Sequence, residues 1–144
     1  MNTVRQLLKA KGTQVCTISK NETVANAMQL MAEKRISSLV VTEAGKVVGI
    51  FTERDFARKI GPAGKDPALT KIETVMTKEL ITVGLNQTVN DCMTLMADHH
   101  IRHLPVMDGD DLVGIISVGD VVKDIIEELE FHVEQLTSYI KGFR

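Results

Sequence analysis

The 144-residue sequence contains no tryptophan, one tyrosine and two cysteines, and its apolar runs are only a handful of residues long. Two cysteines, Cys16 and Cys92, are too few for a disulfide framework and are expected to be buried thiols in a reducing compartment. Apolar runs this short do not span a bilayer, and residues 1–5 show no apolar signal segment. We therefore expect a cytoplasmic protein that makes no membrane contact.

Charge of either sign is also modest, since 17 Lys and Arg against 19 Asp and Glu leave a net charge of −2. The sequence lacks a Lys/Arg cluster interleaved with aromatic residues, which argues against a nucleic-acid partner. The two halves differ, however: residues 1–70 hold 11 basic and 6 acidic residues, whereas residues 71–144 hold 6 and 13. Such complementary halves favour docking on each other or on a second copy of the chain.

The chain contains an internal duplication. Residues 17–60 align without gaps onto residues 82–125, a shift of 65 positions, and sixteen of the 44 aligned residues are identical. Unrelated chains of this composition would match at roughly one position in fifteen or twenty. The period is longer than the repeats of solenoid proteins, so we interpret it as a doubled supersecondary unit.

Each unit is predicted to have the order β-α-β-β-α. The first three expected elements span 15–18, 23–34 and 38–42 in the first unit, and 80–83, 88–99 and 103–107 in the second. A polar turn then leads to a hairpin strand, at 47–51 or 112–116, and the closing helix begins at Thr52 or Ser117. Asn21 and Asn86 are the expected helix N-caps. Pro105 inside a strand suggests an edge position or a strand start.

The predicted helices each carry an apolar face. The residues at helical spacing are Val24, Ala27, Met28 and Met31 in one unit and Val89, Cys92, Met93 and Met96 in the other. The glycine- and proline-containing linker at 61–67 is expected to end the first closing helix. The fold class is therefore α+β (α/β-type), with two similar units.

The strongest repeated motif is Gly-x-x-Thr/Ser-x-x-Asp, at 49–55 and 114–120, where a strand meets a helix. Its simplest interpretation is a helix cap, in which Thr52 or Ser117 pairs with the acid three residues later. The motif occurs twice, and each copy has a glycine inside a strand, where close approach of another group is a common reason for it. A carboxylate can accept hydrogen bonds from a vicinal diol, and a helix N-terminus with a hydroxyl can donate to phosphate.

These features resemble the CBS (cystathionine-β-synthase) domain in its tandem arrangement, the Bateman module. The motif pair carries the resemblance together with residues 101–106 and the segment Val75-Met76-Thr77, and it extends over about residues 3–126. It implies two repeats packed with pseudo-twofold symmetry and two clefts for adenosine-containing ligands. The predicted divisions are residues 1–70 for the N-terminal segment, repeat 1 and linker, residues 71–126 for repeat 2, and residues 127–144 for a C-terminal amphipathic helix.

Matching positions carry the site residues over from the family. The resemblance implies that Thr52 and Asp55 hold phosphate and ribose in one cleft, and that Ser117 and Asp120 do so in the other. The positions that line or flank the adenine correspond to Thr17, Ile18, Ser38, Leu39, Thr82, Val83, His103, Leu104 and Pro105.

Two arginines are candidate phosphate partners, because arginine pairs with phosphate in a bidentate way. They are Arg54 and Arg102, and ordinary solvated surface arginines are the alternative. Arg54 aligns with Gly119 and Arg102 with Ser37, so the two clefts are expected to differ.

Chemistry other than binding is not indicated. The sequence has no P-loop, no dinucleotide-binding glycine pattern and no nucleophile elbow. His99 and His103 have the i,i+4 spacing that chelates metals on a helix, but the repeat places His103 at a strand start. We therefore predict no catalytic residue and no metal site, and the chain is not expected to be an enzyme.

The C-terminal segment shows heptad spacing, with apolar residues at Leu129, Val133, Leu136 and Ile140. Two heptads are too short to form an isolated helix, so this stripe is expected to be covered. The favoured cover is a second chain in a homodimer, and packing on the N-terminal helix around Val4, Leu7 and Leu8 is the alternative.

The expected function is a regulatory module that binds an adenine nucleotide and passes its ligand state to a regulated partner protein. AMP or NAD is favoured, with ADP, ATP or S-adenosylmethionine as further candidates. A triphosphate is disfavoured because acidic residues dominate around the second motif. The alternative function is a purely structural dimerisation module with vestigial clefts.

Overall fold

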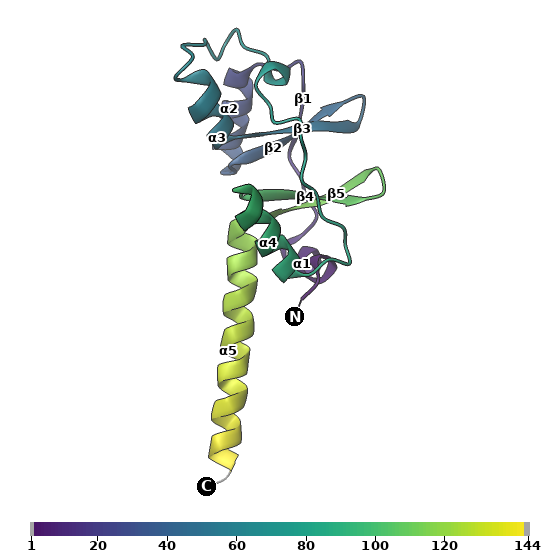
Figure 1. Cartoon of the computed structure of the whole chain (residues 1–144), viewed down its shortest axis with the longest axis vertical. Helices are drawn as coiled ribbons and strands as arrows, with labels where there is room; N and C mark the ends of the chain where they lie inside the picture. The colour runs from purple at the N-terminus through teal and green to yellow at the C-terminus, as the bar shows by residue number, and fades with distance from the viewer. Residues whose placement is uncertain (1, 143–144) are drawn as a thin grey trace.

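The computed structural model describes residues 2–142. The N-terminal helix α1 spans Val4–Lys11. Repeat 1 holds β1 (Thr17–Ser19), α2 (Val24–Lys34), β2 (Ser38–Glu43), β3 (Lys46–Thr52), the short α3 (Glu53–Asp55) and the π-helical turn η1 (Phe56–Ile60). The 3₁₀ turn η2 (Ile72–Thr74) follows. Repeat 2 holds α4 (Val89–His99), β4 (His103–Asp108), β5 (Asp111–Ser117) and α5 (Val118–Gly142). Two small sheets lie one above the other, and α5 extends away from them (Figure 1).

The two hairpins have the same register, as the duplication predicts. Ser38 pairs with Thr52 across β2 and β3, and His103 pairs with Ser117 across β4 and β5. The register shift after Val41 recurs after Val106. Both helices that precede these hairpins end in a left-handed residue, Arg35 or His100. The α+β fold with two related units is thus confirmed.

The first strand of repeat 2 differs from the prediction. Strand β1 pairs in parallel with β2, but around residues 80–83 only Val83 forms a bridge, to Val106. In repeat 1 the Val40 N–H donates to the Cys16 carbonyl at 3.1 Å. The corresponding residue in repeat 2 is Pro105, which has no N–H to donate. The expected strand is therefore reduced to a bridge, and β4 is left at the edge of a two-stranded sheet.

The helix caps also differ from the prediction. Thr23 and Thr88, rather than Asn21 and Asn86, are the N-caps of α2 and α4, and the Thr88 hydroxyl accepts from the Asp91 N–H at 3.1 Å. Threonine satisfies an otherwise unpaired N–H of the first turn. The predicted apolar faces are buried except at Met93, which is 40% exposed, and Met28, which is half-buried.

Each repeat is completed by a segment that precedes the other repeat. Val4, Leu7 and Leu8 of α1 belong to the core of repeat 2, whereas Ile72, Val75 and Met76 belong to the core of repeat 1. The predicted divisions at residues 70 and 126 cut the chain into consecutive segments. Side-chain packing crosses the division at residue 70, because α1 packs on repeat 2 and residues 72–76 pack on repeat 1.

This exchange explains the strand glycines of the motif. A Cβ on Gly49 would lie 2.7 Å from Met76 Sδ, and a Cβ on Gly114 would lie 2.7 Å from Leu8 Cδ2. Van der Waals contact between carbon atoms is optimal at about 3.5–4.0 Å. The group that approaches each glycine is therefore an exchanged apolar side chain of the protein itself.

The closing helices of the two repeats have different lengths. In repeat 1 the helix ends at Ile60, before Gly61, as the linker predicts, whereas α5 continues for 25 residues. The apolar side chains of α5 beyond Ile125 are exposed, whereas the apolar side chains of α1 are buried in the core of repeat 2. Packing of the C-terminal stripe on α1 is therefore contradicted. Among residues 2–142, no helix has the length and apolar character needed to cross a bilayer.

Candidate functional site

Two cavities lie between the repeats and are related by the duplication. The first, of about 590 Å³, joins the motif of repeat 1 to residues 99–103 of repeat 2. The second, of about 690 Å³, joins Ser117 of the other motif to residues 34–38 of repeat 1. Ser37, Glu53 and His103 line both cavities. The expected pair of inter-repeat clefts is therefore present in the geometry.

In the first cavity the motif forms a complete capping box. Thr52 N–H donates to Asp55 Oδ2 at 3.0 Å, and Asp55 N–H donates to Thr52 Oγ1 at 3.3 Å. Asp55 Oδ1 accepts from Thr77 Oγ1 at 3.0 Å and pairs with Lys59 Nζ at 3.0 Å. Lys59 also donates to the Val75 carbonyl at 2.8 Å. The capping interpretation is thus correct, and Asp55 additionally ties Thr77, the residue directly after the exchanged residues 72–76, to the motif.

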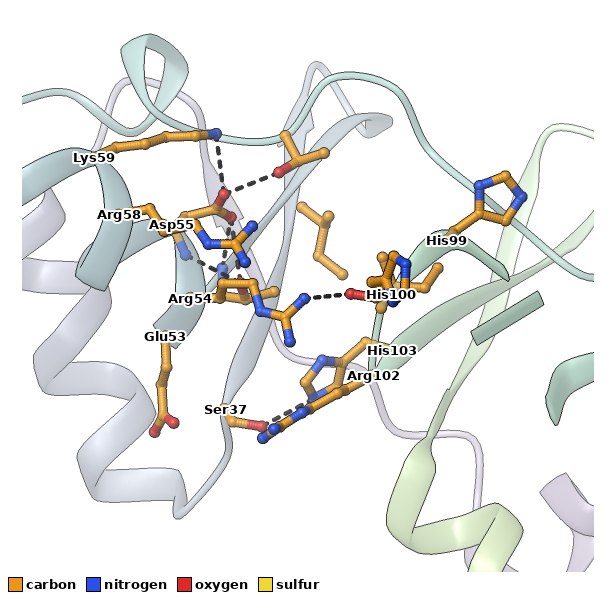
Figure 2. Close-up of a pocket in the computed structure, with 14 residues that line it drawn as sticks. Ser37, Glu53, Arg54, Asp55, Arg58, Lys59, His99, His100, Arg102 and His103 are labelled. Carbon is orange, nitrogen blue, oxygen red and sulfur yellow. Dashed lines mark hydrogen bonds and ion pairs between the residues drawn. The ribbon is translucent and has the colours of Figure 1, made fainter. Parts of the chain in front are cut away.

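Cationic side chains gather around this cavity. Its lining includes Arg54, Arg58, Lys59 and Arg102, against the acids Glu53 and Asp55. Arg54 bridges the repeats by donating to the His100 carbonyl, at the C-terminal end of α4 (Figure 2). The scarcity of cations expected near the second motif therefore does not apply to the first cavity, where an anionic group would meet positive charge.

Beside the second cavity, the acid of the motif has a different ion-pair partner. Ser117 and Asp120 form the same cap, with Ser117 N–H donating to Asp120 Oδ2 at 2.8 Å. The Lys11 ammonium group binds the same Asp120 oxygen at 2.6 Å and the Ile115 carbonyl at 2.7 Å. Burial alone would raise the pKa of Asp120, but the hydrogen bonds from Lys11 and Ser117 outweigh it and hold the pKa below its ordinary value. The predicted difference between the clefts thus extends to the acid of the motif.

A hydrogen bond between the repeats forms part of the wall that the two cavities share. Ser37 Oγ lies 2.9 Å from His103 Nε2 (Figure 2). Burial lowers the pKa of His103, and the nearby charges of Arg102 and Lys11 lower it further, against an opposing effect of Asp120. His103 is therefore held neutral in the folded chain.

Acidification is expected to destabilise the protein through His103. Because its folded-state pKa is depressed, His103 contributes stability above its unfolded pKa of 6.5, and this is lost as the pH falls through the folded-state value. Between pH 7.5 and 5.0 the thermal midpoint of the wild type should fall a few degrees more than that of His103→Gln. Parallel pH profiles of the two proteins would contradict this assignment.

The predicted site residues fall into three groups. Thr52, Arg54, Asp55, Arg102 and His103 line the first cavity, and Ser38, His103 and Ser117 line the second, with Asp120 beside it. Ile18, Leu39, Val83 and Leu104 are core residues. Thr17 and Thr82 are exposed and Pro105 is buried, and neither cavity lining includes them.

Several lining residues were missed from the sequence. Arg58, Lys59 and Thr77 line the first cavity, and Lys11, Lys34 and Arg35 line the second. Arg58 and Lys59 lie one helical turn after Arg54 and Asp55, so helical spacing could have identified them. Lys11 comes from helix α1, and no local pattern in the sequence predicts that this helix packs on repeat 2.

The three clustered histidines diverge in the structure. His99 ends α4, His100 adopts a left-handed conformation and His103 begins β4. Within residues 2–142, no three His, Cys, Asp or Glu side chains come together as metal ligands would.

Comparisons with known proteins identify the family. The chain is 36% identical to the mitochondrial CBS domain-containing protein CBSX3 of Arabidopsis thaliana, covering 97% of this chain and 72% of that one. A solved protein with CBS domains from Burkholderia ambifaria MC40-6, assigned by its name to signal transduction, is 43% identical with a TM-score of 0.85, covering 88% and 95%. The CBS domain pair of protein MJ0100, solved with 5′-methylthioadenosine and S-adenosyl-L-methionine, is 25% identical with a TM-score of 0.78, covering 89% and 98%.

These names describe CBS-domain and signal-transduction proteins rather than enzymes, in agreement with the prediction that the chain is not an enzyme. The sequence profile of the CBS domain matches residues 4–62 and 72–127, which are the two repeats and the helix α1. Profile, relatives and fold agree that the chain belongs to the CBS domain family, as a tandem pair of CBS domains.

Proposed function

We propose that the chain is a regulatory module that binds an adenine nucleotide in the first inter-repeat cavity. The observation that carries this proposal is the meeting of Arg54, Arg58, Lys59 and Arg102 around the Thr52–Asp55 motif in a cavity of about 590 Å³. Ligand pockets typically have volumes of about 300–1,000 Å³. The binding of two adenosine compounds by the CBS pair of MJ0100 supports the class of ligand.

We assign roles to four charged side chains of this cavity. Arg58 and Arg102 meet the phosphate, Arg54 holds the two repeats together beside it, and the Asp55 carboxylate faces the ribose. AMP and NAD are the favoured ligands, and ADP, ATP and S-adenosylmethionine compete for the same site. Because four cations line the cavity, more than one phosphate group can be neutralised there.

Regulation follows from the position of the cavity between the repeats. A ligand that contacts both repeats stabilises the arrangement in which it binds best and shifts the population toward it. The long helix α5 continues directly from repeat 2, so it carries such a change to a homodimer contact or to a regulated partner.

The free thiols Cys16 and Cys92 support a reducing cytoplasm as the compartment, and burial raises the pKa of Cys92 to about 11.

A structural dimerisation module without ligand is the second candidate, and one observation favours it. Asp55 and Asp120 each take part in a helix cap and an ion pair within the chain, so each motif has a structural use. Titration calorimetry of the full chain with AMP, NAD, ADP, ATP and S-adenosylmethionine, and with UMP as a control, separates the two. We expect saturable one-site binding of at least one adenosine compound and none of UMP; no binding of any of them supports the structural module.

A further inference from the structure

Helix α5 carries an apolar stripe that no other part of residues 2–142 covers. The stripe consists of Val122, Ile126, Leu129, Val133, Leu136 and Ile140. Leu129 is 60% exposed and Leu136 is 63% exposed, and the helix extends away from both sheets (Figure 1). The spacing along the stripe alternates between four and three residues, which is the heptad repeat of a coiled coil. The stripe therefore has the periodicity that fits another helix.

The module to which α5 belongs lies on the other side of the helix. Val121 and Asp124 are the buried residues of α5, and Ile125 packs against the core of repeat 2. At 3.6 residues per turn, Val121 and Asp124 lie on the face opposite the α5 stripe. A continuous helix that contacts its module through one face cannot turn the opposite face onto the same module. The cover must therefore come from outside the described residues.

The residue types at the seam select the occupant. With Ile126 at position a, the a positions hold the β-branched residues Ile126, Val133 and Ile140, and the d positions include Leu129 and Leu136. β-Branched residues at a with leucine at d favour two parallel strands. We propose that the α5 stripe pairs with the same stripe of a second copy of this chain, as a parallel, in-register, two-stranded coiled coil.

The flanking charges are compatible with this pairing. In a parallel coiled coil the g residue of one helix faces the e residue of the next heptad on the other. Here Ile125 faces Glu130 and His132 faces Thr137, so these pairs bring no like charges together. The other acids of this region, Glu127, Glu128 and Glu134, lie at b and c, away from the seam. Parallel pairing places the two CBS modules at the same end of the coiled coil.

Alanine variants of the full chain test the interface. By sedimentation equilibrium we expect a wild-type dimer whose dissociation constant rises about thirtyfold with Leu129→Ala and again with Leu136→Ala. Alanine keeps the helix, so folding is retained and circular dichroism verifies it. The matched control is Phe131→Ala, because Phe131 is 56% exposed on the opposite face and should leave the dimer unchanged. A monomeric wild type, a trimer or tetramer, or a dimer that survives both leucine changes would overturn the proposal.

Cross-linking tests the direction of the strands. In a chain with Cys16→Ser, the variant Ile140→Cys places a thiol at the last a position of the stripe. Parallel pairing brings the two thiols together, and mild oxidation should give a covalent dimer. In an antiparallel pair they would lie about 27 Å apart at 1.5 Å per residue. A dimer that fails to cross-link at 140 would overturn the parallel arrangement.

Discussion

Replacement of Asp55 with alanine is expected to weaken adenine-nucleotide binding about a hundredfold, because it removes the buried carboxylate that we propose accepts hydrogen bonds from the ribose hydroxyls. Asp55 is 6% exposed, and its oxygens also fix Thr52, Thr77 and Lys59 at the cavity edge. Its loss therefore removes the proposed ligand contact and loosens the cavity wall. The measurement is the dissociation constant by titration calorimetry, with the ligand that binds the wild type.

Two further variants make this result interpretable. Asp55→Asn keeps the shape of the side chain, so its affinity should also fall while its thermal midpoint stays closer to that of the wild type. Asp120→Ala is the matched control, because Asp120 holds the same motif position but is paired with Lys11 in the other cavity. Its effect on the first cavity should stay below about fivefold, about 1 kcal/mol. Equal losses in Asp55→Ala and Asp120→Ala would contradict a site at the first motif.

Replacement of Gly49 with alanine is expected to lower the free energy of unfolding by about 2–3 kcal/mol, through overpacking. The added Cβ would lie 2.7 Å from Met76 Sδ and 2.9 Å from the Thr77 carbonyl oxygen. A flexible side chain can move, but the backbone oxygen is held, since the Ile50 N–H donates to it at 3.0 Å. Urea denaturation measures the change.

The matched variant is Gly114→Ala in repeat 2. The three atoms nearest to its Cβ would all belong to the flexible side chain of Leu8, so the loss should be smaller, about 1 kcal/mol. Gly61→Ala should be close to neutral, because its nearest neighbour, the Ala57 carbonyl oxygen, lies 3.9 Å away. If Gly49→Ala is no more destabilising than Gly114→Ala, the backbone contact at Thr77 is not what requires glycine.

The sequence predicted the repeat architecture well, because register and helix positions depend on local periodicity that the duplication presents twice. The hairpins begin at Ser38 and His103 as expected. The predictions that were wrong depend on contacts between distant residues or on a single hydrogen-bonding group. Pro105 lacks the N–H that a third strand requires, and Thr23 and Thr88 compete successfully with Asn21 and Asn86 for the caps.

The candidate site was predicted only in part for a similar reason. Motif residues such as Thr52 and Asp55 are local in sequence and line the first cavity, as the resemblance to the CBS domain implied. Ile18 and Leu104 occupy core positions instead, because apolar strand residues contribute more when they are buried. Lys11 reaches Asp120 across 109 residues, and no local pattern predicts a contact at that separation.

The exchange of α1 and residues 72–76 links folding to the order of synthesis. Repeat 1 lacks Ile72, Val75 and Met76 of its core until the chain has passed the linker, and α1 has no core to join until repeat 2 emerges. Contacts of such sequence separation slow folding, since loop-closure entropy must be overcome first. The two repeats are therefore expected to become stable together, late in translation, rather than one after the other.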